Sequence, residues 1–230
     1  MSHHNTELKK TASDKVAEFI SNNRTVLWIS LAVLIVAIVV FAVIDNNIQK
    51  KSDLYSDMIA ELQDDYQNVY SASEEEKETL ENAFLEKTGE IISQDKASIL
   101  VEKALFYRGQ LYLQQEEWVS AADDFKKIAE ISPDSYLASV SLYNGASALE
   151  NNGDVEEALS LLNVISEKYR SESPILPETL FNIARLNEKL GKAEDAITVY
   201  EDLEKSYPSS SWTNLAKTRI ISLKASGVSQ

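Results

Sequence analysis

Hydrophobic residues are distributed in two ways along the chain. From residue 26 to residue 44 they form one run, VLWISLAVLIVAIVVFAVI, without a charge, glycine or proline. From residue 45 onward they recur every three or four positions with polar residues between them, which predicts amphipathic helices. No segment alternates apolar and polar residues as a half-buried strand does. The pattern predicts an all-α chain with one continuous apolar helix near its start.

The apolar run is long enough to cross a bilayer. Nineteen residues at about 1.5 Å each span roughly the 30 Å of a hydrocarbon core. Fourteen of them are Leu, Ile, Val or Phe, which together favour insertion by roughly 4 to 8 kcal/mol. We therefore expect a transmembrane helix over residues 25–45. Two alternatives are a cleaved signal peptide, whose apolar region is usually shorter, and a buried helix of a soluble protein.

The basic residues that flank the run predict its orientation. Lys9, Lys10, Lys15 and Arg24 precede the run, whereas only Lys50 and Lys51 follow within twenty residues. By the positive-inside rule, residues 1–24 form a cytoplasmic segment and the C-terminal part lies outside the cytoplasm.

Part of this cytoplasmic segment is itself amphipathic. In DKVAEFISNN, the apolar residues Val16, Ala17, Phe19 and Ile20 lie on one side of a short helix. The sequence leaves three roles open: docking of a cytoplasmic partner, contact with the membrane surface, or simple extension of the transmembrane helix.

The second half of the chain contains an internal repeat. Three stretches match in phase: LFYRGQLYLQQEEWVSAADDF, LYNGASALENNGDVEEALSLL and LFNIARLNEKLGKAEDAITVY. Each has a leading leucine, a small residue four later, another small residue twelve beyond, and a large residue four after that. The members are Leu105, Gly109, Ala121 and Phe125, then Leu142, Ala146, Ala158 and Leu162, then Leu180, Ala184, Ala196 and Tyr200. Small residues on facing helices permit close approach, and the large residue fills the space beside them.

Glycine and proline mark the expected ends of the helices. Gly153 and Gly191 lie between the two helices of the second and third copies and suit a left-handed turn. Pro133 and Pro208 follow the second helices of the first and third copies. The second copy has Arg170 at that place. Asp154 and Glu157 have the spacing of a capping box.

These residues resemble the tetratricopeptide repeat family, and residues 101–208 are interpreted as three such repeats. The copies recur at 37 and 38 positions, about one helical turn more than the 34 of the family. Residues 209–230 are expected to form a capping helix and a tail. Residues 46–100 are expected to be a helical linker or a degenerate repeat. In this region we expect helices over 55–70 and 74–92, the second opened by a capping box of Ser73 and Glu76.

The resemblance implies a fold and a function. Helix pairs stack into a solenoid, whose first helices line a surface that binds proteins. The candidate groove residues on these helices are Phe106, Gln110, Tyr143, Asn144, Ser147, Phe181, Asn182 and Arg185. The aromatic members form a stripe for an apolar client or pack only against neighbouring helices, and both readings stay open. The family's clamp for a C-terminal carboxylate is rejected, because Asn144 alone fits among the five positions Phe106, Gln110, Asn144, Glu178 and Asn182.

Composition narrows the functional classes. The net charge is −15, and such an acidic surface disfavours nucleic acid as a partner. The chain has no cysteine, and its two histidines, His3 and His4, both precede the apolar run. Adjacent histidines without nearby carboxylates are a poor metal site. No nucleotide-binding glycine loop is present. We therefore expect no enzyme activity, no cofactor, no metal and no small-molecule substrate.

The order of short basic segment, single span and acidic repeats also resembles the ancillary subunits of the bacterial SecYEG secretory translocon. This resemblance implies a single-pass protein of the bacterial inner membrane with its C-terminal domain in the periplasm. The implied partners are translocon subunits, periplasmic chaperones or secreted clients. The alternative is a structural scaffold that self-associates in a cell-envelope or division complex.

Overall fold

The computed structural model describes residues 11–94, 98–170 and 173–227, and within these ranges it contains only helices. The elements are α1 (Ala12–Ser71), α2 (Glu74–Gln94), α3 (Ile99–Gln114), α4 (Trp118–Ile131), α5 (Tyr136–Asn152), α6 (Val155–Lys168), α7 (Leu176–Lys189), α8 (Ala193–Ser206) and α9 (Ser211–Ala225). The predicted all-α class is confirmed. Lys9, Lys10, His3 and His4, which entered the topology and metal predictions, lie outside the described residues. The chain divides into two compact units, residues 1–56 and residues 57–230.

The first unit is dominated by α1, which contains the apolar run. Its large side chains between Val26 and Ile44 are all exposed, from 38% for Leu27 to 71% for Phe41. The most apolar window has a mean hydropathy of 3.2, and none of it is buried. By length and composition the helix can cross a membrane. Its apolar side chains are not buried as those of a core helix would be.

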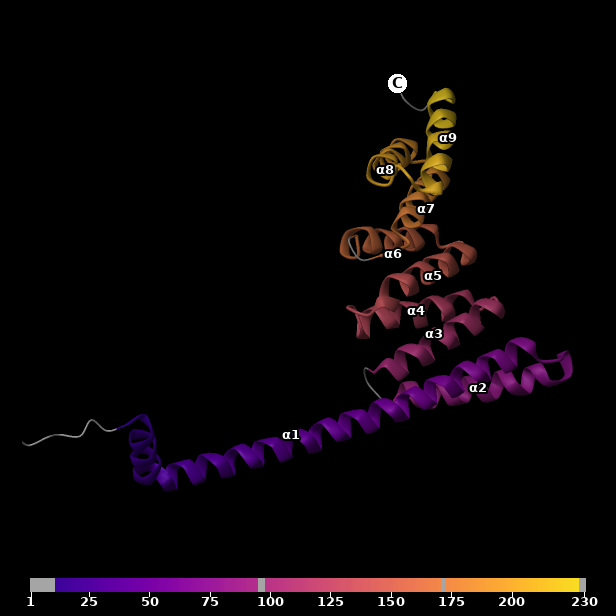
Figure 1. The fold of residues 1–230 in the computed structure, drawn as a ribbon. Helices are drawn as coiled ribbons and strands as arrows, with labels where there is room; N and C mark the ends of the chain where they lie inside the picture. The colour runs from indigo at the N-terminus through magenta and orange to yellow at the C-terminus, as the bar shows by residue number, and fades with distance from the viewer. Residues whose placement is uncertain (1–10, 95–97, 171–172, 228–230) are drawn as a thin grey trace, which may run out of the picture. The chain divides into compact units, whose positions relative to one another are not determined.

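Helix α1 bends once, at Asn23, whose φ of −116° and ψ of 16° are not helical. The amphipathic segment therefore does not extend the apolar helix in a straight line (Figure 1). At its other end, α1 continues without interruption to Ser71. The prediction of a separate helix over 55–70 is wrong in this respect, because nothing in the sequence between Ile44 and Tyr55 breaks a helix.

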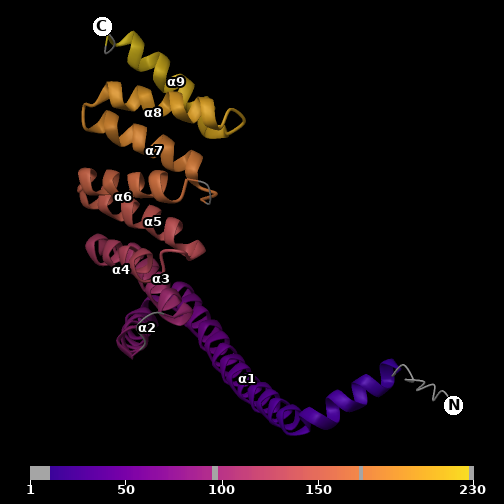
Figure 2. The same ribbon diagram turned by 90° about the vertical axis from the view of Figure 1, so that its left-hand side faces the viewer.

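The second unit is a stack of helix pairs. Helices α3 and α4, α5 and α6, and α7 and α8 form three pairs, each packed against the next along the chain. Figure 1 shows α6 and α8 on one side of the stack and α5 and α9 on the other, and Figure 2 shows the same order of layers. This is the predicted helical solenoid.

The repeated small and large residues form the core of the stack, as the sequence predicts. Ala121, Ala158 and Ala196 are fully buried, as are Phe125 and Tyr200. The Phe125 ring packs directly on the backbone at Gly109, where a Cβ would lie 3.0 to 3.2 Å from three of its ring carbons. The first pair can close this tightly because the residue is glycine.

The turn inside each pair has the same geometry in all three copies. Gly153 and Gly191 have φ values of 95° and 74°, and Glu116 at the equivalent position has a φ of 60°. The next residue in each turn donates its backbone N–H to a carbonyl five residues back, at Tyr112, Leu149 and Asn187. These bonds cap the carbonyl ends of α3, α5 and α7. Glu116 is thus a non-glycine residue in a left-handed conformation.

The second helices of the first and third pairs end where the sequence predicts, but the predicted capping box at the start of α6 is wrong. Helices α4 and α8 end at Ile131 and Ser206, shortly before Pro133 and Pro208. The capping box of Asp154 and Glu157 is not formed. With φ at −82° and ψ at 63°, Asp154 lacks the extended backbone of a typical N-cap residue. Its carboxylate instead accepts a bond from Asn152.

At the start of α2, Ser73 and Glu76 do interact, but side chain to side chain. The hydroxyl of Ser73 donates to the carboxylate of Glu76 over 3.0 Å.

Both ends of the stack are covered by additional helices. At one end, Tyr66 of α1 contacts Tyr107 of α3 at 5.4 Å between ring centroids, and Lys87 of α2 pairs with Asp65. At the other end, α9 buries Ala216 and Ile220 against the third pair. Helix α9 therefore covers the last helix pair.

Charged side chains join successive pairs of helices. Lys126 of α4 reaches Glu157 of α6, and Arg170 bonds Asp202 of α8. A further contact of this kind is repeated. Glu150 and Glu188 both stand eight residues after a leading leucine, and each receives an arginine from the next first helix, Arg185 and Arg219 respectively. We call each of these two contacts a glutamate–arginine clasp.

Candidate functional site

The candidate site lies between the first helices of the second and third repeats. On α5, Tyr143, Ser147 and Glu150 follow one another at intervals of four and three residues, which places them on one face. On α7, Asn182 and Arg185 lie on one face for the same reason. The two faces meet because α5 and α7 occupy equivalent positions in adjacent repeats.

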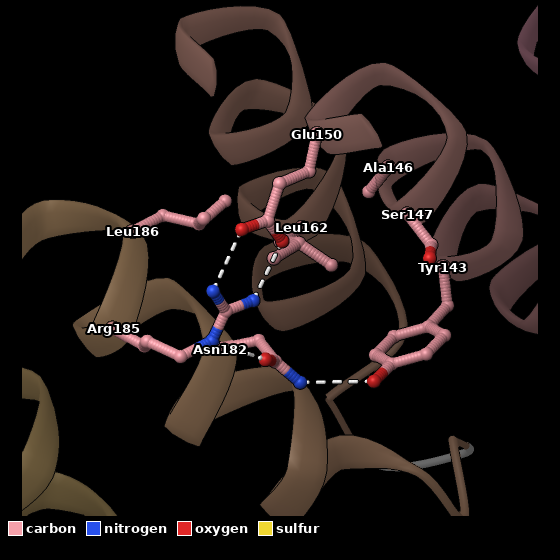
Figure 3. A pocket seen from close by; sticks show the side chains of 8 residues that line it. All are labelled: Tyr143, Ala146, Ser147, Glu150, Leu162, Asn182, Arg185 and Leu186. Atoms are coloured by element: carbon pink, nitrogen blue, oxygen red, sulfur yellow. Dashed lines mark hydrogen bonds and ion pairs between the residues drawn. The ribbon is translucent and has the colours of Figure 1, made fainter. Parts of the chain in front are cut away.

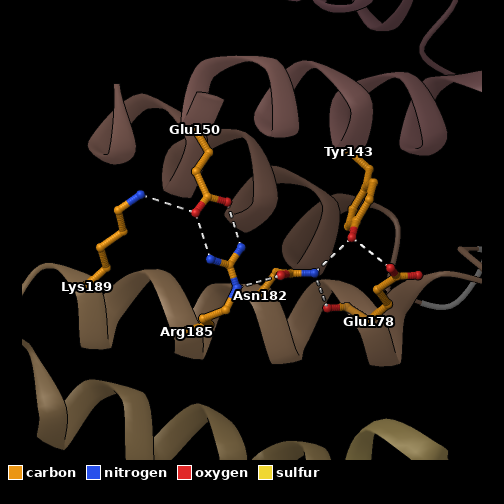
Figure 4. A network of polar contacts seen from close by, with 6 residues as sticks. All are labelled: Tyr143, Glu150, Glu178, Asn182, Arg185 and Lys189. Carbon is orange, nitrogen blue, oxygen red and sulfur yellow. Dashed lines mark hydrogen bonds and ion pairs between the residues drawn. The ribbon is translucent and has the colours of Figure 1, made fainter. Parts of the chain in front are cut away.

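A continuous set of hydrogen bonds crosses between the two helices (Figure 4). The Tyr143 hydroxyl donates to Glu178 over 2.8 Å and accepts from the Asn182 amide over 2.9 Å. The amide oxygen of Asn182 accepts from Nε of Arg185 over 3.0 Å. The other two guanidinium nitrogens of Arg185 reach the two carboxylate oxygens of Glu150 at 2.7 and 2.6 Å.

This network borders a small cleft (Figure 3). Its floor is apolar and its rim is polar; the lining residues are Tyr143, Ala146, Ser147, Glu150, Leu162, Asn182, Arg185 and Leu186. The cleft holds about 40 Å³, far below the roughly 300 to 1,000 Å³ of ordinary small-molecule sites. It has room for part of one side chain or a few waters, not for a cofactor.

The network also changes the proton affinity of its members. Bonds from Arg185 hold the pKa of Glu150 below its usual value of 4.5. Burial raises the pKa of Tyr143, and its hydrogen bond to Glu178 adds to the effect. Near neutral pH the tyrosine is therefore a neutral hydroxyl and Glu150 is an anion. The network thus offers a fixed pattern of hydrogen-bond donors and acceptors.

Four of the eight sequence-predicted groove residues line this cleft: Tyr143, Ser147, Asn182 and Arg185. The other four do not line it. Phe106 is half-buried on α3 against the rings of Tyr107 and Phe125. Phe181 is half-buried on α7, with Tyr200 at 5.5 Å and Trp212 at 5.1 Å. Gln110 and Asn144 are half-buried elsewhere on α3 and α5.

Glu150 was not among the predicted groove residues, although it anchors the network on α5. It accepts bonds from Arg185 and also from Lys189, whose Nζ is 3.3 Å away. A signal was available, because Glu150 lies seven residues after Tyr143 and three after Ser147, on the same helix face. The predicted groove residues stand one, two or five positions after each leading leucine, whereas Glu150 stands eight after Leu142.

Comparison with known proteins supports the interpretation of the helix pairs. Family models described as "Tetratricopeptide repeat" match residues 101–136 and residues 178–210. These matches include most of the first and third pairs, and α5 and α6 form a further helix pair between them. The chain contains tetratricopeptide repeats.

Individual proteins with tetratricopeptide repeats are similar to parts of this chain. A "TPR repeat-containing protein" of Treponema pallidum (strain Nichols) is 31% identical over 117 residues, which are 51% of this chain and 48% of the relative. The chain therefore matches about half the length of this relative. Two crystal structures of nearly identical TPR-like repeats, from a protein assigned as a kinesin light chain in Podosopora anserina, superpose with a TM-score of 0.56. They are 14% identical, cover 75% of this chain and are themselves covered to 89% and 90%, so they show the fold alone.

Tetratricopeptide repeats indicate protein partners, and the cleft is suited to them. Among the described residues there is no group of three or more His, Asp or Glu side chains placed to hold a metal ion. What the site presents is a hydroxyl, a guanidinium and a carboxylate around an apolar floor. This pattern can recognise one polar group of a bound polypeptide.

Proposed function

We propose that this protein is a membrane-anchored, noncatalytic adapter whose tetratricopeptide repeats bind other proteins outside the cytoplasm. The observation that carries the proposal is the cleft on the first helices, in which a bidentate ion pair and an adjacent tyrosine–asparagine pair hold polar groups in place beside an exposed serine.

The cleft supports a binding role because its polar groups are positioned before any partner arrives. Arg185 uses three of its five N–H groups within the protein, and its side chain stays 40% exposed. The remaining donors can meet a carbonyl or carboxylate of a partner. Little ordering entropy is then lost when the partner binds.

The apolar part of α1 supports the anchor. Its exposed side chains have no cover among the described residues, and a bilayer is the environment that such a run requires. The flanking basic residues support an N-terminus in the cytoplasm. We accordingly assign the repeats to the periplasmic side of a bacterial inner membrane, with translocon subunits, periplasmic chaperones or secreted clients as partners.

The test is photo-crosslinking in cells, with a photoreactive amino acid at Ser147 and a matched control at Ser160. Both positions are exposed serines of the second repeat, one on α5 beside the cleft and the other on α6. Neither change removes a member of the hydrogen-bond network. We expect crosslinks from Ser147 to translocon subunits, chaperones or exported chains, and several-fold fewer from Ser160.

Two results would contradict the proposal. Equal labelling from both serines would mean that the cleft has no special role in partner binding. Crosslinks from Ser147 only to a second copy of this chain would favour the self-associating scaffold. In that case, light scattering of the purified protein should show a molecular mass that rises with concentration.

A further inference from the structure

The residues of α1 before the bend form a separate amphipathic helix. Val16, Phe19 and Ile20 are 58%, 60% and 51% exposed. At about 100° per residue they occupy one side of the helix, and Asp14 and Glu18 occupy the opposite side. We call residues 12–22 the arm. Its apolar side has no partner among the described residues.

Both ends of the arm are defined by hydrogen bonds of side chains. At the start, the Thr11 hydroxyl donates to the Asp14 carboxylate over 2.6 Å, and the Thr11 backbone N–H donates to the same oxygen over 2.9 Å. At the bend, the side-chain amide of Asn23 donates to the carbonyl of Phe19 over 2.9 Å. The bend is thus specified by Asn23, without a proline or glycine.

A helix of this length does not hold its shape in water by itself. Isolated helices shorter than about 12 to 15 residues are marginal even with favourable sequences, and packing of an apolar face supplies most of the stability. The arm has such a face and a defined start and end. It therefore requires an apolar surface to lie against.

The bend occurs where the bilayer would supply that surface. The apolar run begins at Val26, three residues after Asn23, which is about 4.5 Å along the helix. If residues 26–44 fill the hydrocarbon core, Asn23 lies at its polar boundary. Beyond Asn23 the arm turns away from the axis of the apolar helix, as both views of this unit show (Figure 1 and Figure 2). A helix that turns at this depth runs along the membrane surface.

We propose that the arm lies in the headgroup layer of the cytoplasmic leaflet, with Val16, Phe19 and Ile20 inserted among the lipid chains. Lys15 stands at the edge of the apolar side, where its chain can extend to lipid phosphates. Asp14 and Glu18 then face the water. This proposal rests on the membrane anchor proposed above and adds a second, interfacial contact to it.

Because the chain has no cysteine, single-cysteine variants can report the depth of each position. The full-length protein would be labelled with a polarity-sensitive fluorophore at Phe19→Cys, Glu18→Cys or Val36→Cys. It would then be reconstituted in vesicles of phosphatidylcholine and phosphatidylglycerol that contain no other protein. Lipid spin labels near the headgroup or near the bilayer centre would serve as quenchers. Val16→Cys and Ser21→Cys repeat the comparison of the two sides of the arm.

We expect the shallow quencher to reduce the fluorescence at residues 19 and 16 several-fold more than at residues 18 and 21. The label at residue 36 should respond to the deep quencher. Equal, weak quenching on both sides of the arm, with residue 36 still deep, would overturn the arm proposal and leave the anchor intact. Equal, deep quenching on both sides would mean that the arm continues the span, which also overturns the proposal.

Two further outcomes bear on the anchor and on the partner of the arm. An unquenched label at residue 36 would refute the anchor and the arm together. The label at residue 19 could instead be exposed to water in these vesicles but shielded in native membranes. That result would overturn the lipid contact and assign the apolar side of the arm to a cytoplasmic protein.

Discussion

Gly109 shows how closely single residues are fitted in the array. Replacing it by alanine adds helix propensity of about 1 kcal/mol, but the new Cβ would press on the buried Phe125 ring, and overpacking costs about 1 to 3 kcal/mol. We expect Gly109→Ala to lower the free energy of unfolding by about 1 kcal/mol, measured by urea denaturation followed by circular dichroism.

The matched control is Gly89→Ala in α2, where no atom lies within 4 Å of the added Cβ. This variant should gain about 0.5 to 1 kcal/mol. If both variants were stabilised equally, the close packing of Phe125 on Gly109 would not exist in solution.

At the same scale, the contribution of Glu150 to folding stability depends on pH. Its pKa is lower in the folded protein than its usual value of 4.5, because Arg185 bonds its carboxylate. A lowered carboxyl pKa contributes stability that is present above about pH 4.5 and is lost as the pH falls through the folded-state pKa. Glu150→Gln should therefore lower the free energy of unfolding at pH 7. The difference from the unmodified protein should shrink progressively below pH 4.5.

Urea midpoints of both proteins between pH 7 and pH 3 measure this difference. Glu86→Gln, on the exposed surface of α2, controls for the loss of one negative charge. A difference between Glu150→Gln and the unmodified protein that stays constant with pH would argue against the ion pair.

At the scale of helices and turns, Glu116 is the one non-glycine residue with a positive φ among the described residues. A left-handed conformation costs such a residue roughly 1 to 2 kcal/mol. Glu116→Gly should raise the unfolding free energy by about 1 kcal/mol, and Gly153→Ala should lower it by a similar amount. Calorimetric melting of both variants tests this expectation, and identical melting temperatures would contradict it.

Helix α9 gives a second prediction at this scale. Its Trp212 ring packs 5.1 Å from Phe181 and, with Ala216, covers the third repeat. In a stack where each repeat contacts only its neighbours, losing the end cover destabilises the adjacent unit first. Trp212→Ala should speed hydrogen exchange in α7 and α8 while α3 and α4 keep their protection. Uniform loss of protection would show that the array unfolds as one unit.

The parts of the fold that depend on local pattern could be predicted from the sequence. The small and large residues recur in phase, so they identified the helix pairs and their core. The same period could also have revealed Glu116, because it stands eleven residues after its leading leucine, as Gly153 and Gly191 do.

The cleft could be predicted only in part. Which side chain of α5 meets which side chain of α7 depends on the register between repeats, and the pattern within one repeat does not determine that register. The bend at Asn23 was also missed, since an asparagine side chain that bonds Phe19 leaves no specific sequence signal.

For the whole molecule, the decisive prediction is topology. A reporter enzyme that folds only outside the cytoplasm, fused after Gln230, should be active, because the basic residues before the span favour a cytoplasmic N-terminus. The same reporter fused after Asn23 should be inactive and serves as the control. A well-expressed but inactive fusion after Gln230 would place the repeats in the cytoplasm and exclude a periplasmic role.

The glutamate–arginine clasps have a consequence for how such a chain can evolve. The third repeat carries both halves of the contact: Arg185 receives Glu150 from the repeat before it, and Glu188 bonds Arg219 in the helix after it. An in-frame duplication of this repeat would give each copy a partner on both sides. The second repeat has Ser147 where the third has Arg185, so its duplication would leave one junction without a clasp. The array can therefore lengthen most readily by copying its third repeat.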